Sequence, residues 1–213
     1  MTPNNRAFQI EACVENFKQA LKAQEAGANQ VELCGRLDLD GLTPPVEEIT
    51  KCLADLNILT KVMIRPEAGV FFKTDKVVAK MISEIHEVKA IGVQHVVFGL
   101  TKKEGTLDIE SLSHLRDRAY PMKVTVHKAI DTCIDVITET SRLVHAGGFD
   151  SILTSGGAKT AQEGAAVLKQ MIQVSDDHLT IIGAGSITID NLEMIDTLIG
   201  GRIYHGKRIV GSL

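Results

Sequence analysis

Short apolar runs alternate along this chain with longer segments that carry an apolar residue at every third or fourth position. The short runs predict buried strands, and the longer amphipathic segments predict helices. The clearest helix begins after Thr74, and its apolar stripe consists of Val77, Val78, Met81, Ile82, Ile85 and Val88. Glycines such as Gly27 and Gly92 end helical segments directly before the next strand. The pattern therefore indicates a strict alternation of strand and helix.

Eight strands and seven helices are expected from this pattern. The strands are expected at residues 7–14, 30–34, 59–64, 95–99, 123–126, 151–154, 180–182 and 202–205. Helices are expected at residues 16–26, 74–92, 108–119 and 189–199. Another helix is expected to run from Thr43, as its N-cap, to residue 56. Two more are expected, one that ends at residue 145 and one that follows the capping box formed by Thr160 and Glu163.

Strict alternation requires parallel strands joined by right-handed crossovers. Eight such strands close most simply as a TIM (β/α)₈ barrel, with residues 1–213 as a single domain. An open doubly wound sheet is the alternative, but it usually has fewer strands, and the usual G-x-G-x-x-G after the first strand is missing. Only eight residues follow His205, so the last helix should be missing or very short. The uncovered flank predicts a homodimer.

Composition narrows the possible functions. The chain has 213 residues, 44% of them apolar, and a net charge of −4, which favours neither nucleic acid nor an anionic membrane as a partner. The N-terminal residues have no apolar core of signal-peptide length, and no apolar run approaches the roughly 18 residues of a membrane span. A cytoplasmic location with four reduced cysteines is therefore expected.

Two expected strands carry ionisable side chains on one face. A period of two places Glu11 beside Cys13 on the first strand and Glu32 beside Cys34 on the second. A parallel strand covered by helices normally has apolar residues on both faces. The repeated carboxylate and thiol therefore predict one polar pocket, at the carboxyl ends of the strands where such barrels carry their sites.

Further polar residues end the other strands. Arg65 follows the third strand, and among seven histidines only His127 and His205 end a strand. Buried carboxylates need a cationic partner, so Arg65 could pair with Glu32 or Glu11, or it could bind an anion, and the two roles are compatible.

Two glycine-rich turns follow consecutive strands. Ser155-Gly156-Gly157 follows the sixth strand, and Gly185-Ser186 belongs to the turn after the seventh. Backbone amides exposed just before a helix hold phosphate or carboxylate in many barrels. We therefore expect an anion to bind at these turns, with Arg65 and His205 nearby, although glycine also suits tight turns.

The two strand-end thiols have two interpretations. Free cysteine is usually a small buried hydrophobe. Alternatively, since neighbouring strands lie about 4.8 Å apart, Cys13 and Cys34 could bridge one soft ion, Cu(I) foremost among the biological ones. Cys52 and Cys133 fall in helical segments and are expected to be packing residues.

Several motifs, in order along nearly the whole chain, resemble those of the copper homeostasis protein CutC family. They are IEACVE (10–15), VELC (31–34), GLTP (41–44), VMIRP (62–66), VFG (97–99), HKAID (127–131), LTSGG (153–157) and YHG (204–206). The resemblance implies a cytosolic (β/α)₈ barrel, often oligomeric, that is linked to copper tolerance. It also implies that Cys13 and Cys34 are Cu(I) ligands.

Two functions follow as hypotheses. In the first, the chain binds and traffics Cu(I) through Cys13 and Cys34. In the second, it is a lyase, isomerase or hydrolase acting on a small anionic or phosphorylated metabolite, with His127 and Glu32 as the acid–base pair, Arg65 as the anion clamp, and Glu11 among the binding residues. A scaffold without a site is disfavoured by the cost of so many charges at one barrel end.

Overall fold

The computed structural model describes residues 8–69, 71, 72 and 74–213. Ala7, the expected start of the first strand, lies outside the described residues. The strands are β1 (Gln9–Val14), β2 (Gln30–Leu33), β3 (Leu59–Met63), β4 (His95–Phe98), β5 (Lys123–Val126), β6 (Ser151–Thr154), β7 (Thr180–Gly183) and β8 (Ile203–Gly206). The α-helices are α1 (Phe17–Glu25), α2 (Val46–Asp55), α3 (Asp75–Ala90), α4 (Ile109–Ala119), α5 (Val136–Ala146), α6 (Ala165–Ser175) and α7 (Leu192–Ile199). Two 3₁₀ helices, η1 (Leu37–Leu39) and η2 (Lys128–Thr132), follow β2 and β5.

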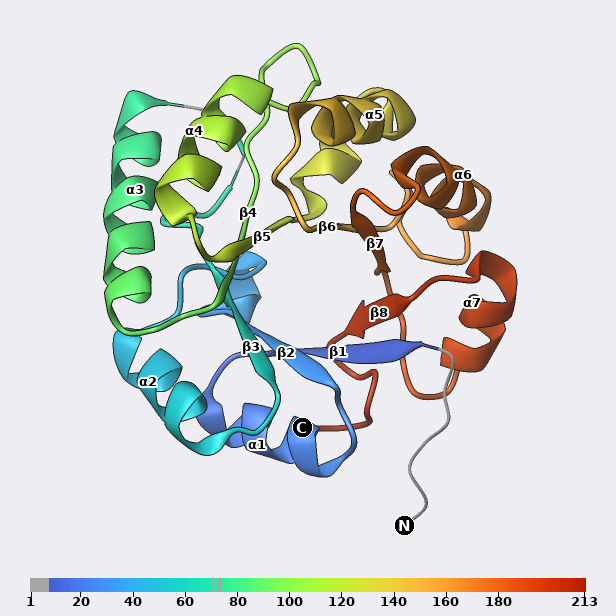
Figure 1. Ribbon diagram of the computed structural model, residues 1–213. Coiled ribbons are helices and arrows are strands. Elements are labelled where there is room, and N and C mark those ends of the chain that lie inside the picture. Colours follow the sequence, from blue (N-terminus) through green and yellow to red (C-terminus); the bar gives the residue numbers. More distant parts are fainter. Residues whose placement is uncertain (1–7, 70, 73) are drawn as a thin grey trace.

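The strands form a closed parallel barrel in the order of the sequence. Each strand pairs with its two neighbours, and the parallel pairing of β1 with β8 closes the ring. The helices surround this ring, as Figure 1 shows. The predicted TIM barrel is therefore confirmed, and within the described chain no helix follows β8.

Local capping determines where most helices begin. Thr74 caps α3 as expected, because its side chain accepts the amide of the residue three positions later. The expected N-cap at Thr43 is wrong, since α2 begins at Val46. The hydroxyl of Thr43 instead accepts the amide of Arg65 at 2.8 Å and donates to Glu84 at 2.6 Å. The Thr43 hydroxyl, which would have capped the helix, is therefore used in tertiary hydrogen bonds instead.

Two later helices also begin further along than the pattern predicts. Thr160 and Glu163 do exchange the two hydrogen bonds of a capping box, at 3.1 and 3.2 Å, but α6 begins only at Ala165. The last helix begins at Leu192, three residues after Ile189. The side chain of Ile189 is 55% exposed, so it does not belong to the buried face of this helix. The homodimer expected from the sequence remains a prediction.

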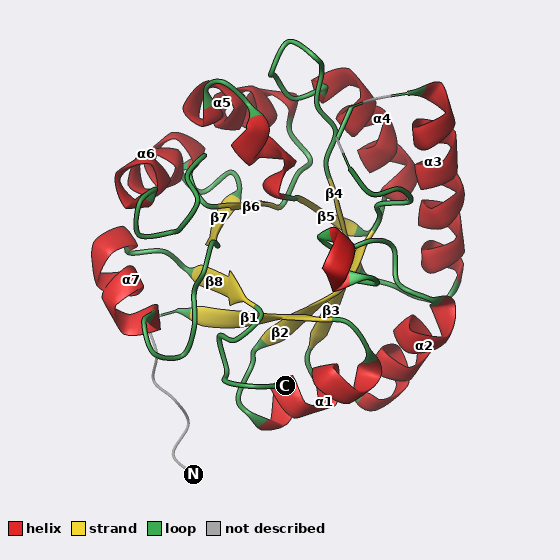
Figure 2. Cartoon of the chain, turned by 180° about the vertical axis from the view of Figure 1, so that it is seen from behind, coloured by secondary structure: helices red, strands yellow, loops and turns green. Residues whose placement is uncertain are grey.

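Alternation along the strands separates the barrel's shell from its interior. Outward side chains such as Val31 and Val62 join the large core beneath the helices. Inward apolar side chains form two smaller clusters. One contains Cys13 and Cys34, and the other contains Leu153 of β6. Figure 2 shows the ring from the other side. Among the described helices, none has the length and apolar character needed to cross a membrane.

Candidate functional site

A cavity of about 450 Å³ lies at the carboxyl ends of the strands. Seven of the residues predicted for the site line it: Cys13, Glu32, Cys34, Arg65, His127, Ser155 and His205. Glu11 is buried two residues before Cys13 on β1, and it contacts the site through His205. Gly185 and Ser186 do not line the cavity. The barrel thus gathers most of the predicted residues from β1, β2, β3, β5, β6 and β8.

One corner of the cavity combines thiol, carboxyl and imidazole groups. Cys13 on β1 lies opposite Glu32 on β2 in the strand register. Ligand atoms of Cys13, Glu32 and His205 all lie within 4.8 Å of one another. Cys34 lies next to them: its thiol lies 3.6 Å from Glu32 Oε2 and also interacts with the side chain of Cys13.

Glu11 holds His205 in place from below. His205 Nδ1 lies 2.9 Å from Glu11 Oε1, and Nε2 lies 3.7 Å from Glu32 Oε2. The other oxygen of Glu11 accepts from Lys61 Nζ at 2.7 Å and from Gln30 Nε2 at 2.6 Å. The cationic partner of this buried carboxylate is therefore Lys61, which corrects the interpretation that Arg65 pairs with Glu11 or Glu32.

Sequence reasoning missed Lys61, although a signal was available. Lys61, Met63 and Arg65 alternate along β3 and its end, so the period of two places them on one face. Lys61 also lies opposite Glu32 in the register of β2 and β3. A lysine inside a buried strand indicates a buried carboxylate partner.

The two carboxylic acids of this corner have opposite protonation. Burial alone would raise the pKa of Glu11, but the charges of Lys61 and His205 lower it far below its usual range. Burial raises the pKa of Glu32 to about 8, and its Oε1 has no hydrogen-bond partner among the described residues. At neutral pH Glu11 is therefore ionised and Glu32 is protonated.

The thiols and the imidazole form a charged pair. The hydrogen bond from Cys34, supported by His205, lowers the pKa of Cys13 to about 5. The same bond, together with burial, raises the pKa of Cys34 well above its usual value. Burial would lower the pKa of His205, but Glu32 in its ionised form, the side chain of Cys13 and that of Glu11 raise it well above 6.5. At neutral pH Cys13 is a thiolate beside an imidazolium.

Arg65 lies across the cavity from β8 and is bound by carbonyl groups. Its Nη2 donates to Gly69 at 3.0 Å, and its guanidinium lies 4.8 Å from the centre of the Phe71 ring. Nη1 contacts the carbonyl oxygens of Leu39, Asp40 and Gly41 at 3.0–3.1 Å. These contacts fix the guanidinium in the cavity wall and connect the loops after β2 and β3.

His127 is held in one tautomer. Its Nδ1 accepts the amide of Ala129 at 3.1 Å, so the single proton of the neutral ring is on Nε2. Burial lowers the pKa of His127 to about 3. The ring is therefore neutral at physiological pH and offers Nε2–H as a donor.

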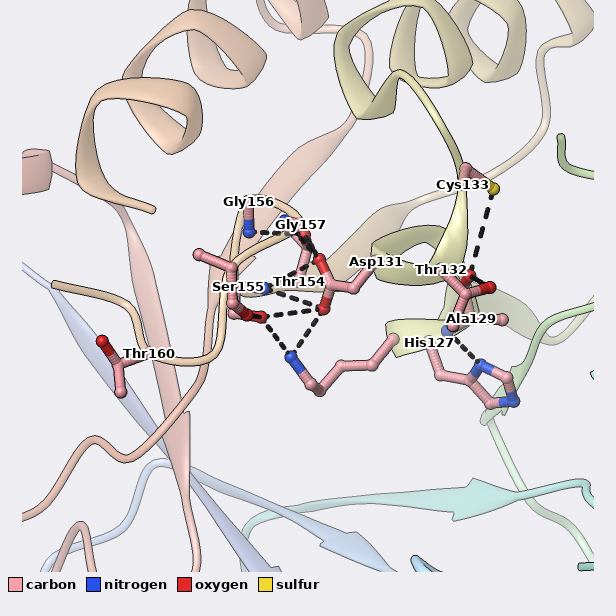
Figure 3. A network of polar contacts seen from close by, with 12 residues as sticks. His127, Ala129, Asp131, Thr132, Cys133, Thr154, Ser155, Gly156, Gly157 and Thr160 are labelled. Carbon is pink, nitrogen blue, oxygen red and sulfur yellow. Dashed lines mark hydrogen bonds and ion pairs between the residues drawn. The ribbon is translucent and has the colours of Figure 1, made fainter. Parts of the chain in front are cut away.

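The glycine-rich turn after β6 binds a carboxylate of the chain itself (Figure 3). The amides of Ser155 and Gly157 donate to Asp131 at 3.0 and 2.8 Å. Thr154 Oγ1 donates to the same carboxylate at 2.5 Å and accepts the amide of Gly156 at 2.9 Å. The amides that the sequence assigned to a ligand anion thus already have internal partners.

The turn after β7 is organised differently. The carbonyl of Gly185 accepts the amide of Ala161 at 2.9 Å, and Ser186 is exposed to solvent. Neither residue lines the cavity, although Gly185 packs against Ser155, which does. The anion site that the sequence places at this turn remains a prediction.

Comparisons with known proteins give one consistent match. The profile of the CutC family matches residues 8–210. A CutC family protein from Photobacterium profundum is 34% identical over 198 residues, which cover 93% of this chain and 80% of the relative. The human copper homeostasis protein cutC homolog is 31% identical over 198 residues, covering 93% of this chain and 72% of the relative.

Solved structures agree with this match. A crystal structure of a protein named CutC from Streptococcus agalactiae superimposes with a TM-score of 0.89 at 26% identity, covering 95% of this chain and 99% of that one. A monomeric dihydrodipicolinate synthase variant superimposes with a TM-score of 0.67 at 11% identity, covering 96% of this chain and 71% of that one. The second likeness shows the barrel fold alone.

Proposed function

Because this chain belongs to the CutC family, we propose that it binds and traffics Cu(I) in the cytoplasm as a copper homeostasis protein. Cys13 and Cys34 serve as the thiolate ligands, and His205 is a further donor. The name of the human relative, a copper homeostasis protein cutC homolog, supports this role. Reduced thiols suit the cytoplasm.

The observation that carries the proposal is the cluster of donor atoms at the thiol corner. Ligand atoms of Cys13, Glu32 and His205 lie within 4.8 Å of one another, and Cys34 is hydrogen bonded to Cys13. Two atoms that share an ion lie up to about 4.6 Å apart, twice a metal–thiolate bond of about 2.3 Å. Thiolate ligands select soft ions such as Cu(I), and imidazole also suits copper. The donor set therefore suits this ion, and the spacing of Cys13, Glu32 and His205 is close to what a shared ion needs.

The surroundings of His205 also suit metal binding. Its Nδ1 contacts Glu11, which leaves Nε2 facing the thiol corner. A carboxylate behind a histidine fixes the ring and increases its basicity as a ligand. Since the His205 ring carries two protons at neutral pH, copper bound at Nε2 displaces one of them. Because Cys34 also has to lose its proton to bind as a thiolate, binding should release protons from both Cys34 and His205.

A competition titration tests the proposal. Cu(I) is titrated anaerobically against a chromophoric chelator in the presence of the wild type and of Cys13→Ser and Cys34→Ser. The matched controls are Cys52→Ser and Cys133→Ser, because these cysteines are buried away from the cavity. The first two variants should bind at least tenfold more weakly, and the controls should match the wild type. Equal affinity in all five proteins would exclude these ligands.

A second function is favoured by one observation. The protonated Glu32, with its pKa of about 8, lies beside the Cys13 thiolate, with its pKa of about 5. Two titratable groups whose pKa values are driven apart can act as an acid and a base. An enzyme of the lyase or isomerase type would use them on a small anionic metabolite, with Arg65 as the clamp and the Nε2–H of His127 polarising the substrate.

Deuterium exchange tests this second function. Metal-free protein is incubated in D₂O with a panel of 2-oxo acids and sugar phosphates, and exchange of carbon-bound hydrogen is followed by NMR. Exchange in the wild type that is lost in Glu32→Gln would support an enzyme. If no member of the panel exchanges, proton transfer on these substrates is excluded.

A further inference from the structure

The cavity is larger than a metal ion requires. Its volume of about 450 Å³ falls among pockets that bind small organic molecules, roughly 300–1,000 Å³. Copper would occupy only the corner of the cavity at Cys13, Cys34 and His205. Residues on β3, β5 and the loops after them form the rest of the wall. This second side needs its own explanation.

Arg65 brings a buried positive charge to the second side. Arg65 is only 7% exposed, and its Nη1 and Nη2 atoms are bound by neutral carbonyl groups. Among the described residues no carboxylate lies within ion-pair distance of its guanidinium, and Asp40 acts on it only at longer range. Carbonyl oxygens hold a guanidinium but do not neutralise it, and a buried charge is stable only when paired. An anion in the cavity would supply the missing charge.

His127 adds a neutral donor beside this charge. Its Nδ1 contacts the Ala129 amide, so Nε2–H lies on the opposite edge of the ring, as the labelled side chain in Figure 3 shows. The Phe71 ring lies 4.8 Å from the Arg65 guanidinium and 5.0 Å from the His127 ring, so it contacts both. At Gly99 a Cβ atom would lie 2.5 Å from His127 Nδ1. The absence of a side chain at Gly99 therefore makes room for the ring.

The mouth of the cavity also favours an anion. Lys128, Lys159 and Lys207 line it together with Arg65. Asp131, a carboxylate in the same lining, is already bound by Lys128 at 2.5 Å and by the amides of the turn after β6. Lys128 is thus paired with Asp131, and Asp40 also belongs to the lining, but Lys159, Lys207 and Arg65 have no ion pair among the described residues.

We propose that Arg65 and the Nε2–H of His127 bind the oxyanion group, a carboxylate or a phosphate, of a small organic molecule that fills the cavity and extends toward Cys13. The site is separate from the copper ligands; it rests on the second function proposed above and specifies the group that its anion clamp binds. Anion binding without any exchange in D₂O would support the site while excluding that enzyme. The Arg65 guanidinium supplies the charge, His127 supplies a directed hydrogen bond, and Phe71 keeps the two groups in place.

NMR titration with simple anions tests this site. Protein labelled with ¹⁵N is titrated separately with inorganic phosphate and with malonate at an ionic strength held constant with sodium chloride. The Arg65 Nε–H and His127 ring signals should shift and saturate with at least one probe. The probe that saturates identifies the group as phosphate or carboxylate.

Two variants and two controls make the result specific. Arg65→Lys keeps the positive charge but removes the planar guanidinium with its paired N–H donors. His127→Asn keeps an acceptor for the Ala129 amide but removes the Nε2–H donor that faces the cavity. Each should weaken binding about tenfold or more, as expected for a hydrogen bond to a charged group. Lys169→Gln, at an exposed position of α6, should leave binding unchanged. If Arg65→Lys does not fold, His127→Asn decides alone.

The outcomes separate this site from copper binding. The Cys13→Ser variant should lose Cu(I) affinity and keep the anion affinity of the wild type. The proposal is overturned if neither anion shifts these signals beyond the effect of sodium chloride, or if the folded variants at Arg65 and His127 bind as tightly as the wild type.

Discussion

Two lysine–glutamate pairs among the described residues, one buried and one exposed, allow a test of what burial does to an ion pair. Lys61 Nζ lies 2.7 Å from Glu11 Oε2, and these side chains are 3% and 1% exposed. Lys51 Nζ lies 2.7 Å from Glu47 Oε1 on α2, and these side chains are 44% and 77% exposed. The residue types and distances match, so the two pairs differ chiefly in their contact with water. Lys61→Met and Lys51→Met therefore form a matched pair of variants.

The expected losses in the free energy of unfolding differ because one pair is shielded from water and the other is exposed to it. At 2.7 Å and an effective dielectric constant of about 20, the attraction is roughly 6 kcal/mol before desolvation is counted. Removing one partner of a buried pair typically costs about 3–5 kcal/mol, because the other charge remains buried. Glu11 keeps its bonds to His205 and Gln30, so the lower part of this range is expected for Lys61→Met. Lys51→Met should cost less than about 1 kcal/mol, as for other exposed pairs.

Urea and thermal unfolding measure both variants. For a chain of this size, about 3 kcal/mol corresponds to a fall in Tm of roughly 6–12 °C. The lowered pKa of Glu11 means that its stabilising charge is present above the unfolded pKa near 4.5 and is lost only when the pH falls through the folded value. In Lys61→Met this carboxylate protonates more readily, which limits the cost, so the deficit should be smaller at pH 5 than at pH 8. A deficit below 1 kcal/mol at pH 8, or one equal to that of Lys51→Met, would refute the reasoning.

Three further predictions concern the cavity. Because the pKa of Cys13 is lowered to about 5, its alkylation by iodoacetamide should already be near the maximal rate at pH 7. Cys52, whose pKa burial raises to about 12, should stay unmodified. Mass spectrometry of the digested protein checks both, and an alkylation rate of Cys13 that still rises tenfold between pH 7 and pH 8 would contradict the thiolate. Because burial raises the pKa of Glu32 to about 8, the folded chain keeps a proton that the unfolded chain releases above about 4.5, so Glu32 makes stability fall as the pH rises from about 4.5 to 8. Urea unfolding between pH 5 and pH 8 should therefore show a smaller loss of stability for Glu32→Gln than for the wild type. The same pH profile in both proteins would exclude the raised pKa. Gly99→Ala should displace the His127 ring and destabilise the fold by about 1–3 kcal/mol, which thermal unfolding detects. An unchanged Tm with unshifted His127 NMR signals would show that the ring does not need the space at Gly99.

The barrel was predictable because its signals are local and repeated. The bounds of β5 and β6 match the sequence expectation residue for residue, since each is a short segment with apolar and β-branched residues and clear ends. The start of α2 was not predictable, because Thr43 followed by proline is typical of a helix start while its hydroxyl is used by Arg65, 22 residues away. A local pattern cannot show which distant group competes for the same side chain.

The candidate site was predictable only as a set of residues. A period of two was enough to place Glu11 with Cys13 and Glu32 with Cys34 on inward faces. The pairing between them depends on register, which a single sequence does not give, so Lys61 as the partner of Glu11 was missed. The contact between Asp131 and the turn after β6 depends on how η2 folds back toward that turn. Strand ends could be assigned from the sequence, whereas the contacts between them could not.

The bond between Glu11 and His205 joins residues that are 194 positions apart, on the two strands that close the ring. During synthesis at about 5–20 residues per second, His205 is translated roughly 10–40 s after Glu11. Throughout that interval the growing polypeptide carries Cys13 and Cys34 without the imidazole that completes their corner. Both sulfurs therefore emerge from the ribosome before the neighbour that helps to lower the pKa of Cys13 has been made.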